Sequence, residues 1–437
     1  MTTEITLTLL RHDLAELPQL TLHAVTPNQP VKTFPLGLEA VVVGSGDNAH
    51  VMVADEHVSR NHCELRLCPN GVLVRDLRSK NGTFVRGVRI EGAYLAPGEM
   101  VQIGDTQISV QVVGPPTQIE LSRAASFGDA LGGTVVMRAL FAKLERAAKS
   151  DETVLLTGES GTGKELLAHA IHERSPRRGG PFVVFDCSAL SDAIFESELF
   201  GYVKGAFTGA DAPRAGMLEA ANGGTVFIDE IGELPLHLQP ALLRAVESRH
   251  VRRLGSNEWV PFDARIVAAT HRDLRQLVAE GSFRHDLYYR LCVVEAQVPS
   301  LRERKDDIAL LVERFLAILN PPRSLDDLPA NALDLLKGHD WPGNVRELRN
   351  TVARLVLFPE LLDDAIAASP VRAASKSSEL LAMPWKAARE LALDEFERRY
   401  LAAMMDKHQG HIATIAEEMR VSKQLVYRLL ARHGLER

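Results

Sequence analysis

The stretch Gly158-Glu159-Ser160-Gly161-Thr162-Gly163-Lys164-Glu165 decides the fold of the central part of this chain. The apolar residues 153–157 precede it, and the amphipathic residues 166–174 follow it. This order predicts a strand, a glycine-rich loop and the N-terminus of a helix, whose N–H groups and dipole face a polyphosphate. Lys164 would reach the outer phosphates, so the stretch predicts a site for a nucleoside triphosphate.

The residue after Lys164 departs from the general pattern of such loops. Serine or threonine usually stands there and places its hydroxyl on Mg²⁺, whereas this chain has Glu165. We therefore expect Mg²⁺ to rely on phosphate oxygens, on water and on a carboxylate from elsewhere in the chain.

A second motif supplies that carboxylate. The run Gly223-Gly224-Thr225-Val226-Phe227-Ile228-Asp229-Glu230 is an apolar strand that ends in two acids. Asp229 would hold the metal, directly or through water, and Glu230 would orient and deprotonate the attacking water. An acid pair after a strand is common at the start of a loop, but its place beyond a complete phosphate loop makes this one specific.

The composition of the 437 residues bounds the remaining possibilities. The length suggests about three domains, and the net charge of −7 means that any contact with DNA needs a local basic patch. The first residues carry an acid and lack a basic segment before a long apolar run, so we expect no signal peptide, and no apolar run is long enough to cross a membrane. We expect a cytoplasmic protein with no membrane partner and four reduced thiols without metal-ligand spacing: Cys63, Cys68, Cys187 and Cys292.

The hydrophobic patterning predicts a multidomain fold. Short alternating runs in residues 1–113 predict a β-sandwich, and residues 114–126 read as a linker. Strands alternate with helices in residues 127–300, which predicts a mostly parallel α/β sheet, and residues 301–366 predict a helical lid. Residues 367–384 read as a second linker, and residues 385–437 are all helical by period.

The end of the chain predicts two short helices joined by a tight turn, over residues 411–419 and 422–432, which matches helix-turn-helix geometry. Ser422 is a good N-cap for the second helix, whose exposed side would carry basic residues. We expect that helix to meet double-stranded DNA, with these residues in the interface: Ser422, Lys423, Gln424, Tyr427 and Arg428. The alternative is an amphipathic pair for dimerisation with a solvated basic face.

Two motifs lie within the β-rich segment, Val58-Ser59-Arg60-Asn61-His62 and the run from Asp76 to Val85 that contains Asn81-Gly82. Together they resemble the forkhead-associated (FHA) domain, a reader of phosphothreonine peptides. The resemblance implies that Ser59 and Arg60 lie at the phosphate edge, that His62 braces the loop and that Asn81 bonds the peptide backbone.

The segment departs from the FHA pattern at one position. The family usually has arginine after the glycine that precedes this region, but Gly44 is followed by Ser45. A bidentate grip on phosphate is therefore missing. Two interpretations stay open: phosphopeptide sensing, or binding of an unphosphorylated partner or of the chain's own ATPase domain.

Four further stretches identify a family for residues 127–366, and they are listed here in chain order: Gly205-Ala206-Phe207-Thr208-Gly209-Ala210, residues 283–291, Leu301-Arg302-Glu303-Arg304, and residues 341–348. With the phosphate loop, they resemble the AAA+ domain of the bacterial enhancer-binding proteins that activate sigma-54 RNA polymerase. Members of that family commonly carry glutamate at the position of Glu165. The Fis-like helix-turn-helix of the family extends the resemblance to the C-terminus.

The resemblance implies roles for individual residues. Phe207 and Thr208 would contact sigma-54, Arg284 and Arg290 would be arginine fingers supplied across a ring, and Arg346 would be the sensor arginine of the lid. A hexamer is the family expectation. From the residues alone, the alternatives are that Phe207 folds back onto its own domain and that Arg284 or Arg290 forms a surface salt bridge, for example with Asp286.

Two positions depart from the family's switch machinery. Asp186 stands where many members have an asparagine that bonds the catalytic glutamate, and Thr270 is followed by His271 where asparagine is common. Asp186 would repel Glu230 unless one carboxyl is protonated or a cation intervenes. Besides residues 158–165, we expect these residues beside the nucleotide: Asp186, Thr270 and Arg346.

Together these motifs predict a sigma-54-dependent activator in which an ATP-driven ring remodels the closed promoter complex. The FHA-like domain would be its regulatory input. Two rivals remain: another AAA+ remodelling ATPase, and a phosphorylation-reading scaffold in which nucleotide only organises a ring.

Overall fold

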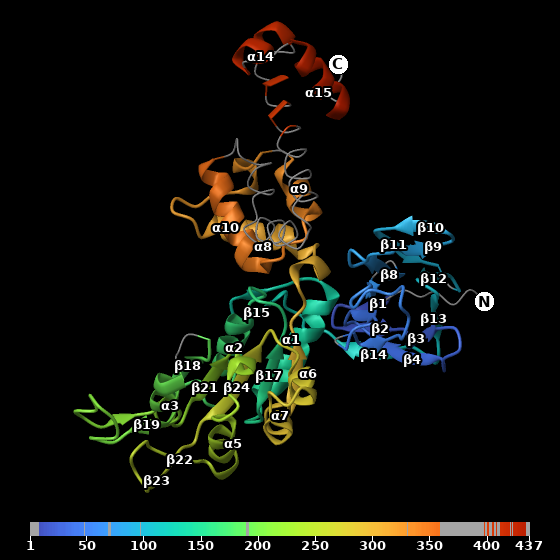
Figure 1. The fold of residues 1–437 in the computed structure, drawn as a ribbon. Coiled ribbons are helices and arrows are strands. Elements are labelled where there is room, and N and C mark those ends of the chain that lie inside the picture. Colours follow the sequence, from blue (N-terminus) through green and yellow to red (C-terminus); the bar gives the residue numbers. More distant parts are fainter. Residues whose placement is uncertain are drawn as a thin grey trace. The chain divides into compact units, whose positions relative to one another are not determined.

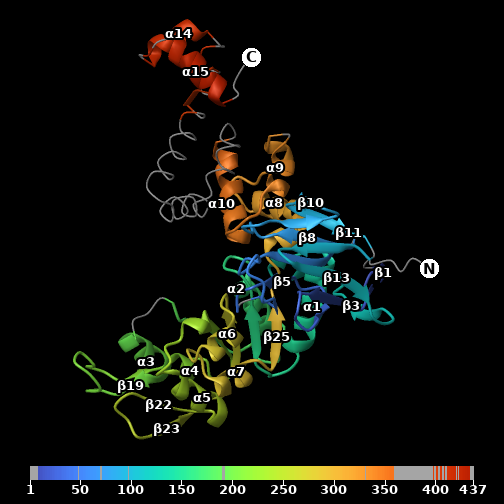
Figure 2. The same cartoon turned by 45° about the vertical axis from the view of Figure 1, so that its right-hand side comes forward.

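The computed structural model describes residues 8–47, 49–68, 71–96, 98–188, 192–329 and 331–358. In the C-terminal part it describes residues 397, 400–401, 404–405, 408, 411–419, 421 and 423–433. The chain divides into two compact units, Met1–Glu360 and Leu361–Arg437 (Figures 1 and 2). The linker expected at residues 367–384 and the expected cap Ser422 lie outside the described residues.

The N-terminal part is a β-sandwich, as the alternating sequence predicts. One sheet has the order β10 (Val88–Ile90), β9 (Thr83–Val85), β12 (Met100–Ile103), β13 (Thr106–Val112), β3 (Leu20–Val25) and β4 (Lys32–Leu36). The other has the order β11 (Gly92–Leu95), β8 (Gly71–Asp76), β7 (Cys63–Cys68), β5 (Val41–Gly44) and β6 (Val51–Met52). Their alternate apolar side chains form one core, which includes Leu22, Leu65 and Ile108.

The segment expected to be a linker, residues 114–126, contains a strand. There β14 (Thr117–Glu120) pairs antiparallel with β2 (Leu14–Leu17), which also pairs with β1 (Thr8–Arg11). Ile119 and Leu121 pack with Ala15 and with residues of α1 (Val135–Ala148). The prolines and polar residues of this segment suggested a linker, but these two apolar side chains fix it against the neighbouring elements.

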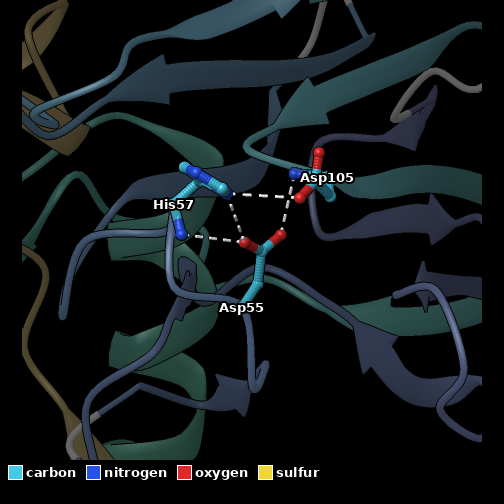
Figure 3. Close-up of side chains that lie close together, drawn as sticks. All are labelled: Asp55, His57 and Asp105. Carbon is cyan, nitrogen blue, oxygen red and sulfur yellow. Dashed lines mark hydrogen bonds and ion pairs between the residues drawn. The ribbon is translucent and has the colours of Figure 1, made fainter.

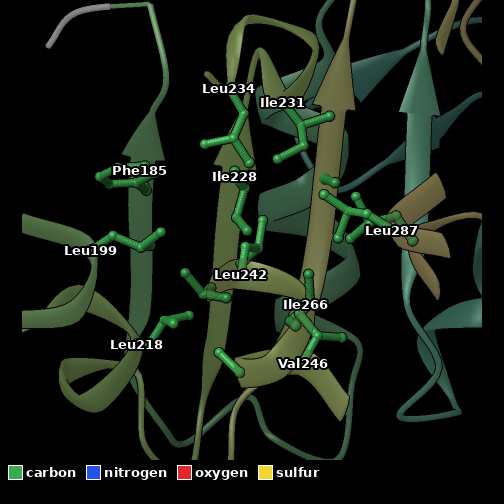
Figure 4. Packing of buried hydrophobic residues seen from close by; sticks show 14 of the residues in the cluster. Phe185, Leu199, Leu218, Ile228, Ile231, Leu234, Leu242, Val246, Ile266 and Leu287 are labelled. Atoms are coloured by element: carbon green, nitrogen blue, oxygen red, sulfur yellow. The ribbon is translucent and has the colours of Figure 1, made fainter. Parts of the chain in front are cut away.

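The central part is built on a five-stranded parallel sheet, which confirms the predicted α/β class. Its order is β18 (Phe182–Asp186), β21 (Thr225–Asp229), β24 (Arg265–Thr270), β17 (Val154–Thr157) and β25 (Val294–Gln297). Both faces are covered, so the strands are apolar on both sides. On one face Ile228 and Ile266 pack with Leu242 and Val246 of α5 (Gln239–Ser248) (Figure 4).

The other face of the sheet packs against α1 and α2 (Lys164–Glu173), through Phe141 and Leu167 among others. Smaller elements complete this part: β15 (Ser126–Phe127), β16 (Ala130–Leu131), α3 (Asp192–Phe200), β19 (Gly201–Tyr202), β20 (Arg214–Ala215), α4 (Met217–Ala220), the 3-10 turn η1 (Ile231–Glu233), β22 (His250–Arg252), β23 (Trp259–Pro261), α6 (Leu274–Ala279) and α7 (His285–Leu291). Because all five strands are parallel, their carboxyl ends meet at one edge, where the motif residues stand.

A helical lid follows, as predicted. It comprises two 3-10 turns, η2 (Leu301–Glu303) and η3 (Leu325–Asp327), and the helices α8 (Asp307–Ala317), α9 (Ala332–Gly338) and α10 (Asn344–Leu357). Trp341 is buried before α10, and its indole N–H donates to Leu336 O at 2.8 Å.

The C-terminal unit contains the two expected helices, α14 (Ile412–Glu418) and α15 (Lys423–His433). They pack through a small core that includes Ile415, Val426 and Leu430. Throughout the part of the chain that the structure describes, no helix combines the length and apolarity that a membrane span requires.

Candidate nucleotide site and effector surfaces

The phosphate loop has the geometry that its sequence predicts. It joins β17 to α2, and its backbone has positive φ at Gly158, Gly161 and Gly163. Positive φ costs residues with a Cβ atom, and a Cβ at Gly161 would lie 2.4 Å from Gly343 O. The buried Lys164 Nζ donates to Gly158 O at 2.7 Å and to Glu159 O at 3.2 Å, which keeps it inside the loop.

The rest of the loop is held by contacts that motif reading did not assign. Glu159 is clamped by two donors of Arg302, one of them at 2.8 Å, and by Asn344 Nδ2 at 3.0 Å. Burial opposes ionisation of Glu159, but the hydrogen bonds and charge of Arg302, together with Asn344 and Lys164, outweigh it, and the pKa of Glu159 is lowered. The Thr162 hydroxyl donates to Glu159 O at 2.8 Å, which closes the turn.

Glu165 and Ser160 are both exposed at the site, and Glu165 lies in the first turn of α2. The positive end of the helix dipole stabilises a carboxylate at this position.

The acid pair stands at the end of β21, beside the phosphate loop. Asp229 Oδ1 accepts from Glu230 N at 3.0 Å, and Glu230 Oε1 lies 4.0 Å from Lys164 Nζ. Burial, and then the negative charge of Glu230, raises the pKa of Asp229. Burial lowers the pKa of Lys164, although the two acids oppose that shift. In this site the surroundings therefore disfavour the negative charge of Asp229, and burial disfavours the positive charge of Lys164.

Asp186 and His271, the two residues that differ from the family's switch pattern, contact different groups. Asp186 is exposed, and its Oδ1 accepts from Ser188 N at 2.8 Å and from Ser188 Oγ at 2.7 Å. His271 instead bonds Glu230, with Nδ1 at 2.7 Å and the backbone N at 3.1 Å from Oε2. Thr270 is buried, and its carbonyl accepts from Gly158 N at 3.2 Å.

The three arginines expected to sense nucleotide lie in different settings. Arg346 is at the phosphate loop, where Nη1 donates to Ser160 Oγ at 3.3 Å. Arg284 is paired in its own chain with Asp286, through bonds of 3.0 and 2.7 Å. The Arg290 side chain is exposed and makes no hydrogen bond or ion pair with the residues that the structure describes.

The loop Gly205–Ala210 projects beyond β19 and β20. It is closed by a bond of 2.9 Å from Gly205 N to Ala210 O, and Thr208 at its tip is exposed. The Phe207 ring is 46% exposed and rests edge-on against Tyr202, with ring centroids 4.9 Å apart. Phe207 is therefore neither buried in the core nor fully free, and Tyr202 is a contact that the motif alone did not indicate.

The expected recognition loops of the β-sandwich are braced by His62. This side chain is buried, accepts from Ser59 N at 3.0 Å and places Nε2 3.1 Å from Gly82 O. Burial lowers its pKa, which favours the neutral ring. Asn81 Nδ2 donates to His57 O at 2.7 Å, and Arg60 is exposed.

Ser45 occupies the position where the FHA pattern has arginine. Its hydroxyl donates to Val58 O at 2.7 Å and so ties two loops together.

A cluster of Asp55, His57 and Asp105 joins the loops at this end of the sandwich (Figure 3). Asp55 accepts from His57 N at 2.9 Å, from Asp105 N at 2.8 Å and from the Thr106 hydroxyl at 2.8 Å. His57 Nδ1 lies 3.2 Å from Asp105 Oδ2. These bonds already use Asp55 as a loop brace, and both other side chains are exposed.

The outer face of β7 and β8 is covered by the beginning of the lid. Glu64 pairs with Arg75 across the two strands, and alternation places Arg66 on the same face. Glu64 and Arg66 are only 7% and 8% exposed, because Arg66 Nη1 lies 3.8 Å from Glu303 Oε1 and Arg75 Nη2 lies 2.6 Å from Asp340 Oδ2. Burial raises the pKa of Glu64, against the attraction of Arg302.

The α15 helix presents one polar side. Lys423, Gln424, Tyr427 and Arg428 are all exposed, whereas Val426 is buried against α14. Tyr427 is 61% exposed, so this helix carries a large aromatic side chain beside basic residues on its open face.

Comparison with known families matches three segments of the chain. Residues 131–297 match the sigma-54 interaction domain, residues 302–379 the AAA+ ATPase lid domain and residues 41–104 the FHA domain. Fold and site thus define an AAA+ domain with an FHA domain ahead of it. The chain belongs to the family of sigma-54-dependent transcriptional activators.

Individual relatives match this chain over different shares of its length. The transcriptional regulatory protein ZraR of Salmonella typhi is 40% identical over 324 residues, which cover 72% of this chain and 71% of ZraR. The DNA-binding transcriptional activator HyfR of Escherichia coli (strain K12) is 46% identical over 256 residues, 58% of this chain and 38% of HyfR. The crystal structure of NtrX from Brucella abortus in complex with ADP has a TM-score of 0.51 and 33% identity, covering 70% of this chain and 69% of NtrX. A second structure of NtrX holds ATP.

Proposed function

We propose that this protein hydrolyses ATP and uses the energy to activate transcription by sigma-54 RNA polymerase. The observation that carries the proposal is the joint placement of Lys164, Asp229 and Glu230 at one sheet edge, in a chain whose residues 131–297 match the sigma-54 interaction domain. Positive and negative charges face each other across a glycine-rich loop, which is the arrangement that phosphoryl transfer needs.

The residues present fit a magnesium nucleotide. Within the described chain no cation forms an ion pair with Asp229, whose raised pKa shows that a nearby cation would stabilise its charged form. Asp229 would hold Mg²⁺, residues 158–165 and Lys164 would bind the phosphates, and Thr270 and Arg346 would flank them. When bound, Mg²⁺ neutralises charge on the phosphates. Glu230 would accept a proton from the attacking water.

Phe207 and Thr208 would carry the output of hydrolysis to sigma-54. The other side chains of their loop are small, and the Phe207 ring rests against Tyr202 and stays about half exposed. An exposed aromatic on a glycine-hinged loop is suited to a partner contact. Arg290, exposed in the last turn of α7, would reach the nucleotide of a neighbouring subunit in a closed ring, for which we propose a hexamer.

The C-terminal pair of helices would hold the protein on upstream DNA. The exposed side of α15 combines Lys423, Arg428 and Tyr427, and it supports a helix that reads base edges while basic groups contact phosphates. In a gel shift with its own promoter region, Tyr427→Ala with Arg428→Ala should lose site-specific binding and retain ATPase activity. Unchanged specific binding would contradict this assignment.

The FHA domain would act on the lid. Its β7–β8 face contacts Glu303 and Asp340, and Glu303 lies next to Arg302, which clamps Glu159 of the phosphate loop. A peptide bound at the neighbouring loops of Ser59, Arg60 and Asn81 would change this contact. Phosphothreonine is the proposed ligand group, and its affinity would be reduced by the absence of arginine at Ser45.

The Glu230→Gln variant tests the coupling of hydrolysis to activation. It keeps the shape of the side chain but removes the base, so nucleotide binding should remain while hydrolysis falls by roughly 100-fold or more. Transcription from a sigma-54 promoter in a purified system should fall with it. Full activation by Glu230→Gln would instead support a scaffold in which nucleotide only organises the ring.

A further inference from the structure

The catalytic glutamate has one neighbouring strand end on each side. The register pairs Asp186 of β18 with Asp229 of β21, and Ile228 of β21 with Ala268 of β24. Glu230 therefore emerges between Asp186 and the residues that follow β24. The end of β18 and the end of β24 both lie close enough to hold the Glu230 carboxylate, and the side chains at each end determine which of them does.

Among the residues that the structure describes, the hydrogen-bond donors to the Glu230 side chain come from the β24 side. Oε2 of Glu230 is 2.7 Å from His271 Nδ1 and 3.1 Å from the His271 backbone N. Because an ionised carboxylate only accepts hydrogen bonds, Nδ1 must carry the proton in this contact. Both donors reach the same oxygen, and this leaves Oε1 on the side of Lys164, at 4.0 Å from Nζ.

The β18 side cannot do the same. Asp186 has no donor when ionised, and its Oδ1 is occupied by the N–H and the hydroxyl of Ser188. A second carboxylate turned toward Glu230 would also add repulsion to a site where Asp229 already carries a raised pKa. Asp186 is instead turned into its own loop.

We infer that His271 is the positioning residue of Glu230: it fixes Oε2 by two hydrogen bonds and thereby aims Oε1 at the nucleotide side of the site. The inference rests on the proposed ATPase function. A carboxylate that must take a proton from water gains from being held in one orientation before reaction. Losing the imidazole would leave the His271 backbone N–H to hold Oε2 alone, so Glu230 would be less well fixed while the phosphate-binding groups stay in place.

Steady-state ATP hydrolysis by the full-length protein tests this inference through variants at two positions. For His271→Ala we expect kcat to fall about 10- to 100-fold, with KM for ATP changed by less than about 2-fold because binding groups are untouched. His271→Asn should recover kcat to within about 5-fold of wild type, since an amide still donates one hydrogen bond. His237→Ala, at an exposed histidine before α5, is the matched control and should keep wild-type kcat.

Two results would overturn the inference. One is wild-type kcat in His271→Ala. The other is a larger loss of kcat from Asp186→Asn than from His271→Ala, which would make residue 186 the partner of Glu230.

A measurement independent of activity separates this inference from the proposed function. Histidine-selective ¹⁵N NMR on the nucleotide-free protein, with the His271 signal identified by its loss in His271→Ala, should show the tautomer protonated at Nδ1. Glu230→Ala should abolish that tautomer preference. An unchanged signal in Glu230→Ala would refute the contact, whereas a wild-type protein that shows the signal but hydrolyses no ATP would refute only the ATPase proposal.

Discussion

Among single residues, Asp229 lies in surroundings that disfavour its charged form in the nucleotide-free protein. Asp229 is half-buried beside Glu230, and burial and that second negative charge raise its pKa. A carboxyl whose pKa is raised in the folded protein favours folding most when it is protonated. The stabilising effect is therefore present below its ordinary pKa and is lost as the pH rises through the raised value.

Asp229→Asn should make the nucleotide-free protein more stable at pH 7. The substitution removes the charge, and the amide oxygen can still accept from Glu230 N, which bonds Asp229 at 3.0 Å. We expect the unfolding temperature to rise by roughly 2–4 °C, the shift that corresponds to about 1 kcal/mol in a domain of this size. Calorimetry at pH 7 and at lower pH checks this, because the gain should shrink as the pH falls through the raised pKa. If Asp229→Asn unfolds at the same temperature as the wild type at pH 7, or at a lower one, the charge of Asp229 does not destabilise the folded protein.

The elements of the central sheet were largely predictable from sequence. Each motif stands directly after a strand, and parallel strands bring their carboxyl ends to one edge, so Lys164, Asp229 and Thr270 had to meet there. The contacts of Glu159 with Arg302 and Asn344 were not predictable, because they join residues far apart in sequence without local periodicity. The same holds for the bond between His271 and Glu230.

Strand β14 was missed for a related reason. Its proline-rich surroundings predict a linker, and only the packing of Ile119 and Leu121 against distant residues reveals a strand. The outer face of β7 shows the converse case. Alternation predicts that Glu64 and Arg66 are exposed, and both are buried because the lid segment covers them.

The phosphate loop is an element whose backbone admits little change. Gly161 has φ of 78°, and an added Cβ would lie 2.4 Å from Gly343 O in the lid segment and 3.2 Å from Arg346 Cβ. Gly161→Ala should therefore push the loop and the lid apart and weaken nucleotide binding by about 10-fold or more. Titration with a fluorescent ATP analogue measures this affinity.

The control for that titration is Gly179→Ala. Gly179 is exposed, and a Cβ there would meet no atom within 4 Å. We expect wild-type affinity from it. Equal losses in both variants would mean that the close approach at Gly161 is not what limits binding.

For the molecule as a whole, we propose that the contact between the FHA domain and the lid connects regulation to the nucleotide site. Arg75 Nη2 is 2.6 Å from Asp340 Oδ2, and Lys305 Nζ is 3.5 Å from Asp340 Oδ1. Asp340 precedes Trp341 and α10, the helix that carries Arg346. A restraint on this segment would therefore limit the movement of the sensor arginine.

Reversing one charge of this pair should release the restraint. We expect Arg75→Asp to raise ATPase activity at low protein concentration by roughly 5-fold, a typical coupling between two sites. The double variant Arg75→Asp with Asp340→Arg restores opposite charges and should return activity toward wild type. ATPase activity against protein concentration measures both, and failure of the double variant to restore wild-type behaviour would count against the contact.

Phe207 and Thr208 are the residues that we propose to couple ATP hydrolysis to sigma-54 polymerase. The most direct measurement of this coupling is ATP-dependent open-complex formation on a sigma-54 promoter with purified polymerase, for wild type, Thr208→Ala and the flanking control Asp211→Ala, at matched ATPase rates. We predict that Thr208→Ala hydrolyses ATP but forms no open complex, and that Asp211→Ala forms it as the wild type does. Normal open-complex formation by Thr208→Ala would refute the coupling role proposed for this loop.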